Sequence, residues 1–131
     1  MLTYQNEPQL AAAELSGLFE SSGIKRPFQD LERLQKMIDN ADLVITARDG
    51  KRLVGIARSV TDFSYCCYLS DLAVDRAYQR QGIGEQLVMR VREAIGPEVS
   101  LVLLSAPSAV DYYPRLGFAR SDKCFFIPRE R

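Results

Sequence analysis

The segment Gln79–Gly84 (QRQGIG) is the first place where residue types and spacing point to chemistry. Its two glycines lie one residue apart, Arg80 adds a positive charge, and an apolar run with helical spacing follows as far as Ile95. This pattern predicts a tight turn into a helix N-terminus, where free backbone N–H groups and the helix dipole favour an anion. The segment therefore predicts a site for phosphate oxygens. The alternative is a turn that uses glycine only for its backbone freedom.

The common phosphate-binding loops and nucleophile systems do not match this chain. A Walker loop needs Gly, four residues and Gly-Lys-Ser/Thr, and the dinucleotide fingerprint needs a third glycine where Leu87 stands. The absence of histidine removes Ser–His and Cys–His nucleophile pairs. The three cysteines lack metal-ligand spacing, so we expect reduced thiols and no metal.

Composition indicates one globular domain spanning residues 1–131, with 47% hydrophobic and 26% charged residues. Lys plus Arg equals Asp plus Glu at 17 each, which gives no electrostatic case for a nucleic-acid partner. The N-terminal residues lack a signal-peptide pattern, and no apolar run approaches the roughly 18 residues that span a bilayer. We therefore expect a cytoplasmic protein with no membrane partner.

The elements around the glycine segment follow from apolar periodicity and turn residues. Helices are predicted at Pro8–Ser21, Pro27–Asn40, Gly82–Ile95 and Ser108–Arg115. Strands are predicted at Leu2–Gln5, Leu43–Ala47, Leu53–Val60, Ser64–Val74, Ser100–Ser105 and, as a closing strand or hairpin, Phe118–Ile127. This order predicts an α/β fold whose mixed sheet combines an antiparallel meander with later crossover strands.

Two motifs resemble the GNAT N-acetyltransferase superfamily. Gln79–Gly84 is similar to its Q/R-x-x-G-x-G/A signature, and a strand that ends in Leu72–Val74 precedes it. Further on, Tyr112–Phe118 (YYPRLGF) resembles the family's F/Y-Y-x-x-x-G-F element. The order of elements agrees over essentially the whole chain. The resemblance implies a GNAT-like mixed sheet flanked by about four helices.

The resemblance implies acetyl-CoA as the acetyl donor. It implies that the pyrophosphate is surrounded by the glycine turn and the residue after it, namely Gln79, Arg80, Gln81, Gly82, Ile83, Gly84 and Glu85. The pantetheine arm would pair with the backbone of Leu72, Ala73 and Val74. In this family a bulge splays that strand from its neighbour, and the sequence does not reveal one here.

The implied reaction is direct attack of an amine on the acetyl thioester. Tyr113 matches the family's tyrosine near the sulfur and is the predicted general acid, because a phenol suits proton donation to a thiolate. Asp71, just before Leu72, is the candidate base, with an ion pair or a cap as the alternative. Phe28 and Arg58 are predicted to contact the acceptor. The positive charges of Lys25, Arg26 and Arg58 could pair with an anionic group on the acceptor.

Two departures from the family pattern accompany the match: Ala106 stands where many members have asparagine, and Pro114 lies inside the last motif. The short chain favours a small-molecule amine as acceptor. A non-catalytic acyl-CoA-binding or regulatory module and a protein N-acetyltransferase are the alternatives. A homodimer is left open.

Overall fold

A computed structural model describes residues 1–131 and shows one mixed sheet with the strand order β1-β2-β3-β4-β5. The strands are β1 (Leu2–Asn6), β2 (Leu43–Asp49), β3 (Arg52–Thr61), β4 (Cys66–Val74) and β5 (Ser100–Val102). The helices are α1 (Ala12–Ser22), α2 (Leu31–Asp39) and α3 (Ile83–Ile95), and short 3₁₀ turns are η1 (Arg76–Tyr78), η2 (Pro107–Ala109) and η3 (Tyr113–Leu116). Strands β1 to β4 form an antiparallel meander, and β5 joins β4 in parallel. The predicted α/β fold is confirmed.

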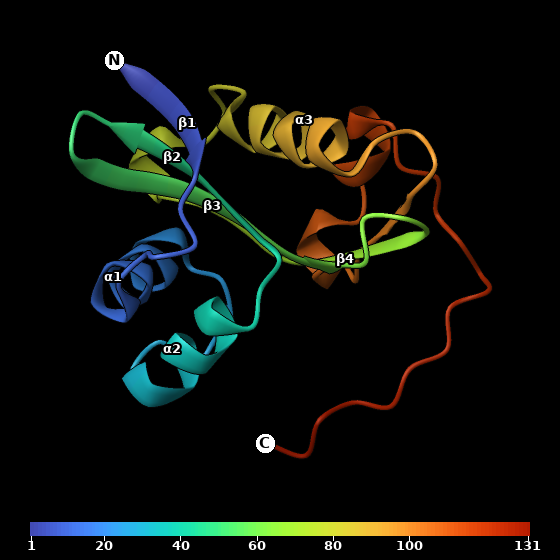
Figure 1. Cartoon of the computed structure of the whole chain (residues 1–131), viewed down its shortest axis with the longest axis horizontal. Helices are drawn as coiled ribbons and strands as arrows, with labels where there is room; N and C mark the ends of the chain where they lie inside the picture. Colours follow the sequence, from blue (N-terminus) through green and yellow to red (C-terminus); the bar gives the residue numbers. More distant parts are fainter.

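The sheet lies between two helical layers, with α1 and α2 on one face and α3 on the other (Figure 1). Each layer has its own core, because the helices present apolar stripes to the alternating side chains of the strands. One core joins α1 and α2 to residues such as Val44 and Ile56, and the other joins α3 to residues such as Val54 and Ala57. The central strands are therefore buried on both faces, which fixes their register.

A bulge in β4 changes which face its side chains occupy. Arg58 of β3 pairs with Asp71 and the next residue of β3, Ser59, pairs with Leu69, so Ser70 has no partner on β3. Leu69 packs in the α3 core, and after the extra residue it is Leu72 that packs there. Asp71 consequently faces the α1–α2 layer, since side chains alternate along a strand.

Strands β4 and β5 pair over a short distance and then separate. Their parallel ladder joins Cys66–Tyr68 to Ser100–Val102 and goes no further. From Leu69 to Val74, β4 is paired with β3 alone, and its other edge is open. The bulge at Ser70 lies just beyond the last paired residue. This arrangement is the splayed strand pair that the family resemblance implies.

The predicted closing strand at Phe118–Ile127 is wrong. Residues 119–131 have no regular structure and run as an extended tail away from the sheet (Figure 1). Phe125 and Ile127 are 94% and 95% exposed. Because β propensity depends on packing against a neighbouring strand, it does not produce a strand here. A cleft lies between the C-terminal half of α3 and the segment after η3, and the tail does not cover it. Met89 and Phe118 are among the residues that line this cleft.

The predicted helix at Ser108–Arg115 is also corrected, to the two 3₁₀ turns η2 and η3. Pro107 and Pro114 each stand at the start of one turn, and proline has no amide to continue a helical ladder. Gly117 then ends η3 in a left-handed conformation (φ +94°). The chain therefore carries three α-helices, with 3₁₀ turns in place of the fourth.

The remaining predicted elements exist, with shifted boundaries. Helix α1 starts at Ala12 instead of Pro8, because residues 7–10 form a turn closed by the amide of Leu10 on the carbonyl of Glu7 (3.0 Å). Helix α2 starts at Leu31, where the Asp30 side chain caps it by accepting from the amide of Arg33 (3.1 Å). None of the helices is long and apolar enough to cross a bilayer.

Candidate active site

The glycine turn leads from the end of β4 into α3, as the sequence predicts. Gly82 is the N-cap of α3 and is left-handed (φ +81°), with no side chain capping the helix. Arg80 is left-handed too (φ +66°), which is uncommon for a residue with a side chain. The Gln79 side chain donates to the carbonyl of Val74 (2.9 Å) and so fixes the turn against the end of β4.

The backbone of this turn is rich in free donors. The amides of residues 80–85 donate no hydrogen bond within the protein, and Gln86 is the first whose amide does so, to the carbonyl of Gly82 (3.1 Å). Arg80 is exposed and forms no ion pair. Six successive N–H groups, a helix N-terminus and a free cation form a donor set suited to a pyrophosphate.

Tyr112 lies against the first turn of α3 and was not among the residues singled out from the sequence. A Cβ added to Gly84 would collide with the hydroxyl oxygen of Tyr112. Burial and the negative charge of Glu85 raise the pKa of this phenol. The second glycine of the motif thus makes room for an aromatic side chain from the other motif. The signal in the sequence that could have drawn attention to Tyr112 is its position directly before Tyr113, which matches the family's tyrosine near the sulfur.

Tyr113 projects from the start of η3 and is half-buried. Its ring meets Phe118 edge to face (centroids 5.7 Å apart) and Tyr112 in the same way (5.3 Å). Its hydroxyl has no hydrogen-bond partner in the protein. Burial raises the pKa of Tyr113, the neighbouring Tyr112 adds to this, and the Arg26 guanidinium partly offsets it. Pro114 does not break the turn, because the amide of Phe118 still reaches the carbonyl of Tyr113 (3.3 Å).

Asp71 is fully buried between two guanidinium groups. Its Oδ1 accepts from Arg26 Nε (2.6 Å) and its Oδ2 from Arg58 Nε (2.5 Å). The ion pair that the sequence left as the alternative is thus present. Both carboxylate oxygens are therefore engaged in ion pairs, and Asp71 is the shared counter-ion of Arg26 and Arg58. The role of Asp71 as base stays a prediction, and this geometry speaks against it.

Arg58 is 7% exposed, and protein atoms occupy its donors. Besides Asp71, its guanidinium reaches the Ser70 hydroxyl (3.0 Å) and the carbonyl of Met37 in α2 (3.4 Å). A direct contact of Arg58 with the acceptor stays a prediction that its burial opposes. Phe28 lies in the loop between α1 and α2 and packs partly against their core. In the same loop Lys25 is exposed and without an ion pair.

The structure brings most of the predicted site residues into one region. The open edge of β4 at Leu72–Val74 leads to the glycine turn, and Asp71 and Arg58 adjoin it on the α1–α2 side. Arg26 bonds Oδ1 of Asp71 (2.6 Å), which joins the α1–α2 loop to the bulge, and its guanidinium partly offsets the rise in the pKa of Tyr113 in η3. Ala106 is exposed and is the N-cap of η2, where its methyl group cannot donate or accept a hydrogen bond as an asparagine could.

Comparison with known proteins shows the family. The family model described as an acetyltransferase (GNAT) domain matches residues 17–126. The "uncharacterized N-acetyltransferase ycf52" of Pyropia yezoensis is 31% identical over 130 residues, which cover 88% of this chain and 71% of that protein. Some other curated relatives are longer, and the chain spans 27% of one and 46% of another.

Solved structures agree. A probable acetyltransferase from methicillin-resistant Staphylococcus aureus superposes with a TM-score of 0.84 at 21% identity, covering 98% of this chain and 100% of that one. An AAC(6′)-Iy structure in complex with a CoA-containing bisubstrate analogue gives 0.75 at 15% identity, covering 100% and 99%. These structures show the same fold, and the match of the acetyltransferase (GNAT) domain model over residues 17–126 gives the class. The chain belongs to the GNAT family.

Proposed function

We propose that this chain is an acetyl-CoA-dependent N-acetyltransferase that acetylates a primary amine, of a small molecule, by direct attack of the amine on the thioester. The observation that carries the proposal is the run of unpaired amides from residue 80 to residue 85, at the end of an open strand edge. A phosphate-bearing ligand that also carries an amide-containing arm matches both features. Membership of the GNAT family supports the same ligand.

The turn and the strand edge hold different parts of acetyl-CoA in this proposal. The amides of Gly82, Gly84 and their neighbours donate to the pyrophosphate, and Arg80 adds its charge. The open edge of β4 at Leu72–Val74 pairs with the pantetheine arm, which needs backbone groups and no particular side chain. Gly82, with no atom close to its missing Cβ, leaves room for the ligand at the turn.

Acetyl-CoA supplies the activated acetyl group when it is bound. Tyr113 then holds a proton on Oη that it can donate to a departing sulfur, and its raised pKa keeps that proton in place at neutral pH. The hydroxyl is free of other partners, so it is available for this role. The chain has no histidine to take a proton from the amine, which leaves a carboxylate, a tyrosine or a water chain as acceptor.

The charges near the open strand edge bear on the acceptor. Asp71 carries one negative charge between the two positive charges of Arg26 and Arg58, and Lys25 adds a further free cation in the same loop. Excess positive charge disfavours a polycationic acceptor and favours the neutral form of the attacking amine. These charges support an amine that carries a carboxylate or another anionic group.

Thermal unfolding with and without acetyl-CoA tests the cofactor site before the acceptor is known. At about 100 times Kd, binding adds roughly 2.7 kcal/mol to stability, and for a domain of this size the midpoint rises by on the order of 10 °C. We expect a rise with acetyl-CoA and with CoA, and none with NAD or ATP at equal concentration. No rise at saturating acetyl-CoA would refute the proposal.

An amine panel then separates catalysis from binding alone. Release of free CoA is followed with amino acids and other anionic amines, with neutral amines, with aminoglycosides and with lysine-containing peptides. The proposal expects the highest kcat/KM with a small anionic amine. Binding without turnover on any member would favour the non-catalytic acyl-CoA module, and turnover on peptides alone would favour the protein acetyltransferase.

A further inference from the structure

Arg26 connects the loop between α1 and α2 to the bulged part of β4. Its Nη2 donates to the carbonyl of Ser70 (2.8 Å) and its Nε to Oδ1 of Asp71 (2.6 Å), while Nη1 donates to the carbonyl of Lys25 in its own loop (2.7 Å). Its side chain is 23% exposed, so these bonds lie partly shielded from water. One side chain thus binds the loop and two successive residues of the strand.

Ser70 is the residue that the ladder leaves unpaired. It has no partner on β3, and β4 has already parted from β5 at Tyr68. A strand at such a point loses the pairing that normally holds its backbone, so other groups must hold it. Arg26 on the Ser70 carbonyl and Arg58 on the Ser70 hydroxyl (3.0 Å) provide those contacts.

We propose that Arg26 is a positioning residue that locks the β4 bulge and thereby sets the open strand edge on which the proposed acetyl transfer depends. The claim about the bulge stands on this geometry alone, whereas its consequence for turnover rests on the proposed function. Arg26 bonds the backbone carbonyl of Ser70 and the side-chain carboxylate of Asp71, so it acts through the strand.

An arginine suits this position because its planar guanidinium offers donors in fixed directions. Nε and Nη2 lie on one edge of the group and reach two acceptors on the same strand, one carboxylate and one carbonyl. A lysine could satisfy one of them at a time. The positive charge of Arg26 also acts on Tyr113, because it partly offsets the rise in the pKa of that phenol.

Arg58 holds the same bulge through other acceptors. It bonds Oδ2 of Asp71, the Ser70 hydroxyl and the carbonyl of Met37, which ties the bulge to α2 as well. Asp71 is then the counter-ion that allows two arginines to converge on one point of the strand. Both helices of this layer are connected to the bulge in this way, α1 through the loop of Arg26 and α2 through Met37.

The test compares Arg26→Met and Arg26→Lys with Lys25→Met, the matched control that removes one positive charge from the adjacent position of the loop without a contact to β4. Amide hydrogen exchange of residues 69–73 is measured on each protein without ligand. We expect exchange to be at least tenfold faster in Arg26→Met, intermediate in Arg26→Lys and unchanged in Lys25→Met. Equal exchange in Arg26→Met and the wild type would overturn the proposal, as would equal acceleration in Lys25→Met.

Steady-state kinetics with the best amine of the panel adds a readout that general destabilisation would not move. We expect Arg26→Met to lower kcat by tenfold or more, with the KM for acetyl-CoA within twofold of wild type, and Arg26→Lys to recover part of kcat. A rise in KM without a fall in kcat would contradict the positioning role. If Arg26→Met does not fold, Arg26→Lys is compared with Lys25→Met for exchange and with wild type for kcat.

The two experiments keep the two proposals apart. Faster exchange in the Arg26 variants together with no thermal shift by acetyl-CoA would leave the bulge lock standing and reject the acetyltransferase. A thermal shift together with unchanged exchange would retain the cofactor site and reject the lock.

Discussion

The hydroxyl of Tyr112 occupies the space that a Cβ on Gly84 would need. Gly84 belongs to the glycine turn at the start of α3, and Tyr112 belongs to the aromatic motif that contains η3. The two motifs recognised separately in the sequence therefore touch in the structure. Because Tyr113 follows Tyr112 directly, this contact also helps to fix the proposed acid relative to the free amides of α3.

Replacing Gly84 by alanine should destabilise the protein in spite of the helix propensity of alanine. The methyl group would meet the Tyr112 hydroxyl, and overpacking of this kind costs about 1–3 kcal/mol. Tyr112→Phe removes the obstructing oxygen, so the double variant should recover most of that loss. Urea unfolding of the two single variants and the double variant measures the coupling.

Gly17→Ala is the control, because this glycine is inside α1 and a Cβ there meets no atom within 4 Å. It should be neutral or stabilising by up to about 1 kcal/mol. Equal effects of Gly84→Ala in the wild type and in Tyr112→Phe would show that the hydroxyl is not the obstacle.

Gly82→Trp should weaken acetyl-CoA binding by tenfold or more. A side chain here would extend from the N-cap into the region assigned to the pyrophosphate, and the left-handed backbone (φ +81°) adds strain. Gly50→Trp is the matched control, since Gly50 is also left-handed (φ +62°) and also has open space at its Cβ, but lies in the β2–β3 hairpin. Calorimetric titration with acetyl-CoA compares them. Similar affinities for the two variants would place the pyrophosphate elsewhere.

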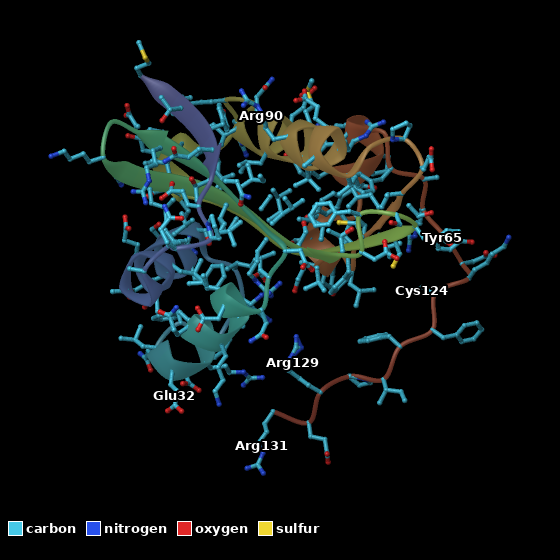
Figure 2. The ribbon with its side chains drawn as sticks, viewed as in Figure 1. Glu32, Tyr65, Arg90, Cys124, Arg129 and Arg131 are labelled. Carbon is cyan, nitrogen blue, oxygen red and sulfur yellow. The ribbon has the colours of Figure 1, made fainter.

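Tyr113→Phe should lower kcat by about 100-fold, the lower end of what a positioned general acid contributes. Affinity for acetyl-CoA should stay within twofold, because the hydroxyl makes no bond in the protein and the ring packing on Phe118 is kept. Tyr65→Phe is the control: Tyr65 is 78% exposed just before β4 and projects away from the sheet (Figure 2). Unchanged kcat in Tyr113→Phe would remove the tyrosine from the chemistry.

Much of this architecture could be predicted from the sequence, because apolar periodicity reports burial directly. The strands around Asp49-Gly50 and the helix after Gly82 follow from local patterns. The bulge at Ser70 could not be predicted, since it depends on how β3 and β4 register over their whole length. The ion pairs of Asp71 with Arg26 and Arg58 could not be predicted either, because they join separate segments of the chain.

The C-terminal segment shows the limit of propensity. Phe125–Ile127 has the composition of a strand, but a strand needs an adjacent one, and the structure gives this segment none. Cys124 and Arg129 lie along the same extended tail (Figure 2). The tail touches the body through the carbonyl of Arg131, which accepts from Arg33 of α2 (3.3 Å).

Glu7 gives the protein a pH-dependent stability that does not involve the site. Its buried carboxylate accepts from Arg48 Nε (2.8 Å) and Nη2 (3.0 Å) and from the Thr46 hydroxyl, and these bonds, the Arg48 ones first, lower the pKa of Glu7 from 4.5 to about 2 against the effect of burial. Arg48 also binds Glu14 of α1 (2.8 Å), so the cluster links the segment after β1 to β2 and α1.

The folded-state pKa of Glu7 lies below its unfolded value, so its ionisation stabilises the fold fully above pH 4.5, and this contribution is lost as pH falls towards 2. Glu7→Gln should therefore reduce the free energy of unfolding by about 2 kcal/mol at pH 7. The difference from wild type should shrink steadily between pH 4.5 and pH 2.5, measured by urea unfolding at each pH. Glu20→Gln, an exposed residue of α1 without an ion pair, should differ little from wild type throughout. A difference for Glu7→Gln that stayed constant with pH would mean that the ion pair with Arg48 does not contribute through the charge of Glu7.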